Sequence, residues 1–214
     1  MLVPYGLSLN DGIKAADAFG VMSEHKDEYL FYRTDHHWTS LGAYYASVAF
    51  CNANDIIPYE IDSYETVVKT GFTGTFYGWA GKPACLKENP DYTVAHYPHI
   101  GYSMIAGNSG NWYNTAAINY NYKTYAGMFI SGDNPLTLIT TENKNGKTLM
   151  VFKESYGNAF VPYTEKALAY ITAEPGANVA DYYKAMDNPN RPITIEWDFN
   201  LEETADSYLI RYSP

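Results

Sequence analysis

Residues 148–160 read Thr148-Leu149-Met150-Val151-Phe152-Lys153-Glu154-Ser155-Tyr156-Gly157-Asn158-Ala159-Phe160. The first five form a continuous apolar run, which is typical of a strand buried on both faces of an α/β sheet. A polar turn with Ser155 follows, and we predict a helix over residues 159–170. Sites in open α/β sheets lie at the carboxyl ends of strands, so a hydroxyl on this turn is well placed to act as a nucleophile. The turn has no Gly two positions before the serine, unlike a G-x-S-x-G elbow.

A second group of reactive side chains lies upstream, in Asp35-His36-His37-Trp38. We predict a strand over residues 28–32 before it and a helix over residues 41–50 after it, with Thr39 or Ser40 as the N-cap. In extended backbone, residues i and i+2 project to the same side about 6 to 7 Å apart. The Asp35 carboxylate can therefore accept the Nδ1 proton of His37 and leave Nε2 free as a base.

The other segments give a coarser picture. Residues 135–140 read as a strand, residues 142–147 as a hairpin-like turn, and residues 63–81 alternate β-branched and aromatic residues with glycines. We therefore expect one main domain over residues 1–175. The segment 176–214 differs from it, because two alternating stretches at 193–197 and 208–212 resemble strands of a fibronectin type III-like sandwich.

Composition restricts the function classes. The 214 residues carry a formal charge of -10, so a surface that tracks phosphates is disfavoured and nucleic acid is not expected as a partner. Aromatic residues make up 16% of the chain, a composition that suits an extracytoplasmic protein handling polar rings such as sugars. We see no stretch long enough to span a membrane. Cys51 and Cys85 lack the spacing of a cysteine zinc site, so we expect two buried thiols, with one disulfide as the alternative.

Asp35, His37 and Ser155 together supply an acid, a base and a nucleophile. The two segments that contain them resemble the signature segments of the bacterial DHHW proteins, which are relatives of the alginate O-acetylation proteins within the SGNH hydrolase superfamily. Two further segments support the resemblance. Residues 127–136 are similar to the family's Gly-Asn-x-Pro-Leu segment, and residues 74–77 are similar to its Gly-Thr-Leu-Tyr turn.

The resemblance implies a three-layer α/β/α, flavodoxin-like SGNH domain with permuted sequence blocks and a short C-terminal β appendage. It implies that Ser155 is the nucleophile, His37 the general base and Asp35 the residue that orients the base. His36 falls at a variable position of the motif. Further expected site residues are Trp38, which packs under the loop or stacks on a sugar, and three candidates for substrate or oxyanion contacts: Tyr156, Gly157 and Asn158. The Ser155 amide is a further expected oxyanion donor.

The implied activity is that of an O-acyl esterase or O-acetyltransferase on an envelope or secreted glycan, with no metal or other cofactor. The family normally carries an export signal or membrane anchor, so we expect an extracytoplasmic location. Three alternatives remain at this point. Asp35, His36 and His37 could bind a metal together with His96 and His99. The chain could be a non-catalytic glycan-binding or scaffold protein, or an inactive fragment of such an enzyme. Asp35 and His37 could also simply fasten a structural loop.

Overall fold

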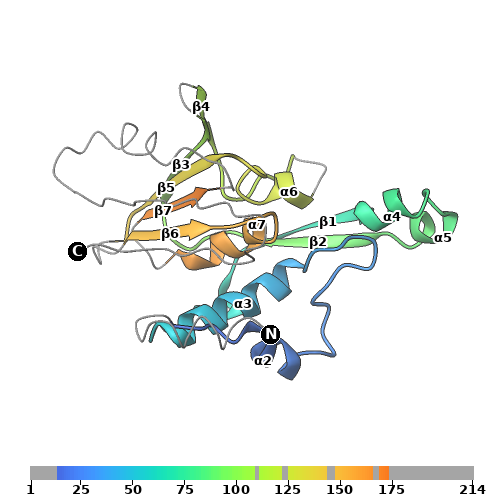
Figure 1. The fold of residues 1–214 in the computed structure, drawn as a ribbon, viewed down its shortest axis with the longest axis horizontal. Coiled ribbons are helices and arrows are strands. Elements are labelled where there is room, and N and C mark those ends of the chain that lie inside the picture. The colour runs from blue at the N-terminus through green and yellow to red at the C-terminus, as the bar shows by residue number, and fades with distance from the viewer. Residues whose placement is uncertain (1–13, 109–110, 122–124, 144–147, 166–168, 174–214) are drawn as a thin grey trace, which may run out of the picture. The chain divides into compact units, whose positions relative to one another are not determined.

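The fold is described by a computed structural model that covers residues 14–108, 111–121, 125–143, 148–165 and 169–173 (Figure 1). The helices and strands in chain order are α2 (Ala18–Glu24), α3 (Ser40–Ala53), η1 (Ile61–Ser63), β1 (Thr66–Phe72), α4 (Thr75–Trp79), α5 (Ala84–Glu88), β2 (Asp91–His96), β3 (Tyr102–Asn108), β4 (Asn111–Thr115), α6 (Tyr125–Met128), β5 (Leu136–Thr141), β6 (Thr148–Phe152), α7 (Gly157–Phe160), η2 (Val161–Thr164) and β7 (Ala169–Ala173).

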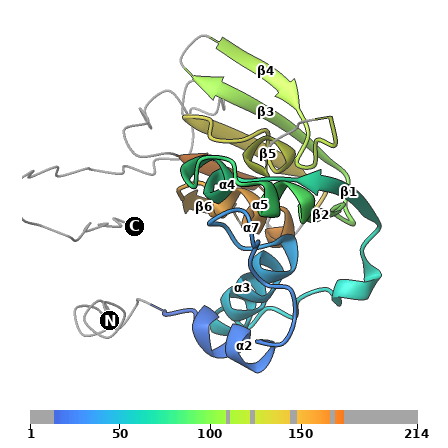
Figure 2. The same cartoon turned by 90° about the vertical axis from the view of Figure 1, so that its right-hand side faces the viewer.

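Five strands form a mixed sheet in the order β4-β3-β5-β7-β6, and β1 pairs with β2 in an antiparallel ribbon. Only β6 and β7 are parallel among the described pairs. Helices α2 and α3 lie together on one side of the five-stranded sheet in both views (Figures 1 and 2). The predicted α/β class is therefore confirmed.

The predicted strands at 135–140 and 148–152 are confirmed as β5 and β6. The prediction that residues 148–152 are buried on both faces is wrong, because β6 is the edge strand of the described sheet and Phe152 is 41% exposed. The hairpin predicted at 142–147 is also wrong. Strand β7 lies between β5 and β6, so the two strands that flank this segment are not partners.

The helix predicted over residues 159–170 is wrong in its extent. Helix α7 ends at Phe160, the 3-10 turn η2 contains Pro162, and the chain is a strand again from Ala169. Proline lacks the N–H that an α-helix needs beyond its first turn, and the pairing of β7 with both neighbours outweighs the local helical pattern. The strand predicted over residues 28–32 is reduced to one bridge between Phe31 and Trp38.

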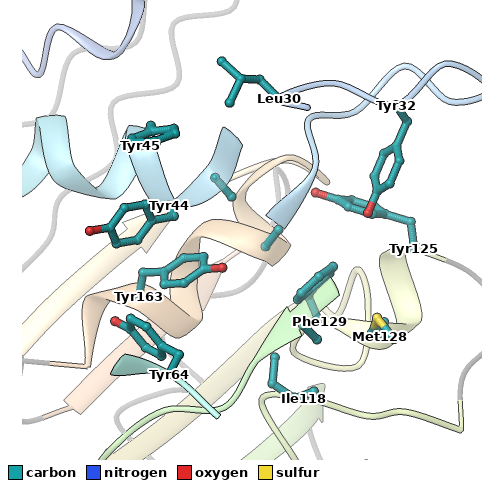
Figure 3. Packing of buried hydrophobic residues seen from close by; sticks show 13 residues of the cluster. Leu30, Tyr32, Tyr44, Tyr45, Tyr64, Ile118, Tyr125, Met128, Phe129 and Tyr163 are labelled. Carbon is teal, nitrogen blue, oxygen red and sulfur yellow. The ribbon is translucent and has the colours of Figure 1, made fainter. Parts of the chain in front are cut away.

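Helix α3 is the central helix of the core, and Thr39 is its N-cap, as predicted, with a side chain that accepts a hydrogen bond from the Gly42 amide. It packs against α2, α7, η2 and β2. Its buried face meets a core that is rich in tyrosine, where the rings fill volume and several hydroxyls find internal partners (Figure 3). For example, the Tyr44 hydroxyl donates to the Tyr59 carbonyl at 2.9 Å.

Cys51 and Cys85 form no disulfide with each other, as the simpler prediction has it. Cys51 is buried as predicted, but the prediction that Cys85 is buried is wrong, because Cys85 is exposed. Among the described residues, no helix is both long and apolar enough to cross a membrane. The strands predicted at 193–197 and 208–212, and the division at residue 175, concern the segment after residue 173, which lies outside the described residues.

Candidate active site

The segment between Leu30 and Thr39 is a closed loop that ends at the first turn of α3. The Tyr32 amide donates to the His37 carbonyl at 3.2 Å, and the Thr39 amide donates to the Leu30 carbonyl at 2.8 Å. These two bonds hold the ends of the loop together, so its intervening residues form a tight turn. The loop reaches toward α4 before it returns to the start of α3 (Figure 1), and the Tyr77 amide donates to the Thr34 carbonyl at 3.3 Å.

The loop is anchored by Asp91, the first residue of β2, whose side chain is buried. One carboxylate oxygen accepts hydrogen bonds from the Thr34 amide at 2.8 Å and the Thr34 hydroxyl at 2.6 Å. The other accepts from the Arg33 guanidinium at 3.0 Å and from the Tyr29 hydroxyl. Burial raises the pKa of Asp91, but the hydrogen bonds from Thr34, Tyr29 and Arg33 outweigh it and hold the pKa below its usual value.

Asp35 is buried and accepts hydrogen bonds with both carboxylate oxygens. Oδ1 lies 2.5 Å from His37 Nδ1 and 3.0 Å from the His37 amide nitrogen, and Oδ2 accepts from the Thr75 amide at 2.8 Å. Burial raises the pKa of Asp35, but the hydrogen bonds from His37 and the Thr75 amide lower it more strongly, so the net pKa lies well below its usual range. The carboxylate is therefore ionised and acts as an acceptor toward the imidazole.

A close approach of α4 makes this arrangement possible. A Cβ atom at Gly74 would lie 2.2 Å from the Asp35 Cβ atom. Only a residue without a side chain leaves room for Asp35 here, and the Gly74 amide donates to the Thr34 hydroxyl at 3.0 Å.

His37 joins the loop to the turn after β6. With Nδ1 at Asp35, its Nε2 atom lies 2.7 Å from the Ser155 Oγ atom. The ring stacks on the buried Tyr125 ring, with centroids 4.5 Å apart and an interplanar angle of 22°. The structure thus brings together Asp35, His37 and Ser155 in the order acid, imidazole and hydroxyl. This geometry is that of a serine whose proton a histidine can remove.

Trp38 and Tyr156 tie the two segments together. The Trp38 indole N–H donates to the Tyr156 carbonyl at 3.0 Å, and the Tyr156 hydroxyl donates to the His36 carbonyl. Trp38 is half-buried and packs edge-on against the Tyr156 ring, with centroids 5.3 Å apart. These contacts correspond to the packing role expected for Trp38 and leave its indole N–H engaged with protein.

The other residues expected at an oxyanion site are placed differently. The amides of Tyr156, Gly157 and Asn158 donate within their own turn, to the Glu154 carboxylate, the Glu154 carbonyl and the Ser155 carbonyl. The Asn158 side chain is fully buried and donates to Asp133 at 2.8 Å. These groups shape the turn. Among the described residues, the Ser155 amide donates no hydrogen bond.

Of the five residues considered as metal ligands, the structure brings three close together. Asp35, His36 and His37 have ligand atoms within 4.8 Å of one another. However, both ring nitrogens of His37 have protein partners, and His36 Nδ1 lies 2.6 Å from the Thr75 hydroxyl. His96 and His99 lie elsewhere: His96 contacts Ser40 and Tyr163 in the core, and His99 contacts Glu165. The donor set therefore fits a proton relay better than a metal centre.

Three residues at the site were not predicted from the sequence to act there: Asp91, Gly74 and Tyr125. Residues 74–77 already stood out through the family's Gly-Thr-Leu-Tyr turn, which offered a signal for Gly74. Nothing in the sequence marks Asp91 or Tyr125 as neighbours of loop residues that lie 57 or more positions away, since pattern and propensity report only local structure.

A model of the family described as DHHW protein matches residues 4–172. The chain is similar to a DHHW family protein from Eubacterium siraeum, with 29% identity and a TM-score of 0.71 over 80% of this chain and 60% of that chain. It is also similar to PatB1 of Bacillus cereus, solved with a sulfonyl adduct, with 17% identity and a TM-score of 0.57 over 77% of this chain and 61% of that chain.

These likenesses show the fold, which agrees with an SGNH-like α/β arrangement. The O-acetyltransferase domain of Pseudomonas putida AlgJ aligns with a TM-score of only 0.36 at 14% identity, which is too low to support an argument. None of the curated proteins matches the chain. The chain spans about 60% of the length of the Eubacterium siraeum protein.

Proposed function

The chain belongs to the DHHW protein family, and we propose that it is a serine-dependent O-acyl esterase or O-acetyltransferase that uses Ser155, His37 and Asp35 as a triad. The observation that carries the proposal is the distance of 2.7 Å between Ser155 Oγ and His37 Nε2, with Asp35 Oδ1 at 2.5 Å on the other ring nitrogen. Both distances fall within the reach that proton transfer requires.

In the first half of the reaction, the Ser155 oxygen attacks the ester carbonyl carbon while His37 Nε2 takes the hydroxyl proton. The bond from the carbonyl carbon to the alkoxy oxygen then breaks, and the imidazolium returns the proton to that oxygen. The product is an acyl-serine and a free alcohol. Asp35 stays ionised throughout and stabilises the imidazolium. Water or a sugar hydroxyl then attacks the acyl-serine, with His37 again accepting and returning the proton.

The oxyanion that forms in each half needs a hydrogen-bond donor. We assign this role to the Ser155 amide, because the three amides that follow it already have acceptors in the turn. Loss of one such donor in serine hydrolases costs about 10²- to 10³-fold in turnover, so even one preorganised amide is a substantial contribution.

The proposed substrate is an acylated glycan of the cell envelope or extracellular matrix, and the proposed location is extracytoplasmic. The DHHW family membership and the resemblance of its motifs to those of the alginate O-acetylation proteins support this part of the proposal. The excess of acidic residues, 24 against 14 basic ones, favours such a substrate over nucleic acid.

The test is hydrolysis of p-nitrophenyl acetate by the wild type, Ser155→Ala and Ser63→Ala. Ser63 is a matched control, because its Oγ lies 3.0 Å from His99 Nε2, and His99 Nδ1 lies 2.9 Å from Glu165. The Ser63 hydroxyl, however, donates to the Glu60 carbonyl at 2.5 Å. We expect Ser155→Ala to lose at least 10³-fold in kcat/KM and Ser63→Ala to match the wild type. Equal rates for Ser155→Ala and the wild type would refute the nucleophile assignment.

The same assay separates the alternatives. Treatment with EDTA should leave the rate unchanged if the triad acts without a metal, whereas a loss that Zn²⁺ restores would favour the metal site at Asp35, His36 and His37. If the wild type binds a glycan but hydrolyses neither that glycan's acyl ester nor p-nitrophenyl acetate, the non-catalytic glycan-binding function is favoured.

A further inference from the structure

Large aromatic side chains remain exposed on α4, next to the candidate triad. Trp79 is 71% exposed and Phe76 is 40% exposed, and their rings meet edge to face with centroids 5.7 Å apart. The His36 ring stacks on Trp79 at 5.4 Å with an interplanar angle of 20°. We refer to His36, Phe76 and Trp79 as the aromatic platform. An exposed cluster of large apolar rings beside polar groups is typical of a binding surface.

The aromatic platform is held in a defined position relative to the reacting atoms. His36 and His37 are in ring contact, with centroids 3.9 Å apart, and His37 Nε2 contacts Ser155. Thr75, the first residue of α4, bonds to His36 through its hydroxyl and to Asp35 through its amide. Whatever binds on the platform is therefore placed against the same loop that carries the general base.

We propose that the aromatic platform binds an uncharged pyranose ring of the acylated substrate. This inference rests on the proposed function and adds the residues and the sugar class. A pyranose with equatorial hydroxyls presents a flat face of C–H groups, which stacks on an indole and leaves the hydroxyls at its rim in water.

Charge favours an uncharged sugar over a uronate or phosphate polymer. The chain has 24 acidic and 14 basic residues, so its field opposes a polyanion at low salt. The platform contains no Lys or Arg side chain, and the nearby Asp35 is ionised. A polyanionic chain would therefore find no counter-charge on the platform itself.

The test measures binding in Ser155→Ala protein, so that turnover does not interfere, by titration calorimetry with cellohexaose and with a galacturonate hexamer. We expect cellohexaose to bind and Trp79→Ala in the same background to weaken its Kd by at least tenfold. The Kd of Trp79→Phe should lie between that of the parent and that of Trp79→Ala. Trp112→Ala, which alters a half-buried tryptophan on β4, is the matched control and should bind as the parent does.

Three results would overturn the inference: no binding of cellohexaose by the parent, equal Kd values with and without Trp79, or tighter binding of the galacturonate hexamer. Failure of the proposed function is separate, since it appears as the absence of p-nitrophenyl acetate hydrolysis in the wild type. A protein that binds cellohexaose through Trp79 without hydrolysing esters would retain the aromatic platform and lose the triad assignment.

Discussion

The indole N–H of Trp38 donates to the carbonyl of Tyr156 at 3.0 Å, across 118 positions of sequence. Trp38 immediately follows the histidine of the candidate triad, and Tyr156 immediately follows the serine. This one bond therefore connects the loop of the base to the turn of the nucleophile, and it constrains the distance between them without occupying either reacting atom. The catalytic proposal depends on such constraints, since a misplacement of about 1 Å can cost about 10²-fold in rate.

The first prediction concerns this tie. Trp38→Phe keeps an aromatic ring against Tyr156 but removes the donor, so the turn loses a fixed partner. We expect kcat for p-nitrophenyl acetate to fall about tenfold and the free energy of unfolding to fall by about 1 kcal/mol. Steady-state kinetics and urea unfolding measure the two effects. Trp112→Phe is the control, and an unchanged kcat in Trp38→Phe would show that the tie has no role in catalysis.

The second prediction concerns the close approach of Gly74 to Asp35. A methyl group at Gly74 would overlap the Asp35 side chain, with the Cβ atoms 2.2 Å apart. In Gly74→Ala, Asp35 must shift and its contact with His37 must lengthen, so we expect at least a 10²-fold loss of kcat/KM. Gly78→Ala, within α4 itself, is the matched control, since nothing lies within 4 Å of a Cβ atom there. Similar kinetics in the two variants would contradict the role given to Gly74.

The third prediction concerns Asp91, which organises the loop from β2. Asp91→Asn has only one acceptor oxygen for the donors of Arg33 and Thr34, and it lacks the charge. Hydrogen bonds to charged groups contribute about 1.5 to 3 kcal/mol each, so we expect the free energy of unfolding to fall by about 2 to 4 kcal/mol. Esterase activity should fall as well when it is measured at a temperature at which the variant is still folded. The exposed Asp27→Asn serves as control, and an Asp91→Asn protein as stable as the wild type would refute the anchor.

The fourth prediction concerns acid stability. Burial lowers the pKa of His96 to about 4, and its Nδ1 lies 2.6 Å from the Tyr163 hydroxyl and 3.0 Å from the Ser40 hydroxyl. In the unfolded chain a histidine takes up a proton near pH 6.5, whereas folded His96 stays neutral until about pH 4. The contribution of neutral His96 to the free energy of unfolding is therefore fully present above pH 6.5. It falls by about 3 kcal/mol as the pH drops toward 4.

His96→Asn tests this, because the Asn side-chain oxygen can accept the same hydrogen bonds without titrating. We expect urea unfolding of the variant to show a shallower loss of stability between pH 6.5 and 4 than the wild type. Parallel pH curves would contradict the assignment to His96. The folded pKa values of Asp35 and Asp91 are lowered, so the stability that these two carboxylates contribute is lost only as the pH falls below about 3.8.

The sequence indicated the candidate site better than the sheet around it. Asp35 and His37 could be paired from their spacing, and Ser155 from its place after an apolar run, because these signals are local or belong to the family's motifs. The position of β6 at the edge could not be foreseen, since a short apolar run does not report how many neighbours a strand has. The position of β7 between β5 and β6 could not be predicted either, because its pairing with these two strands outweighs the helical pattern of its sequence.

Asp91 illustrates a second kind of limit to what a sequence predicts. It is one acid among 24 acidic residues, and its role arises only when the fold brings the start of β2 against the loop. Thr39, by contrast, was predictable as an N-cap because capping is a local property of the first helical turn. The family membership shown by the match over residues 4–172 complements local reasoning, because its motifs relate distant segments that no periodicity connects.

The most direct test of the triad is to treat the protein with phenylmethylsulfonyl fluoride and to locate the adduct by peptide mass spectrometry. An activated serine displaces fluoride and forms a sulfonyl ester, while unactivated hydroxyls react slowly. We predict one adduct, on Ser155, that is absent from Ser155→Ala and greatly slowed in His37→Ala, with Ser63 unmodified. An adduct on another residue, or equal labelling of Ser155 with and without His37, would contradict the proposal that His37 activates Ser155.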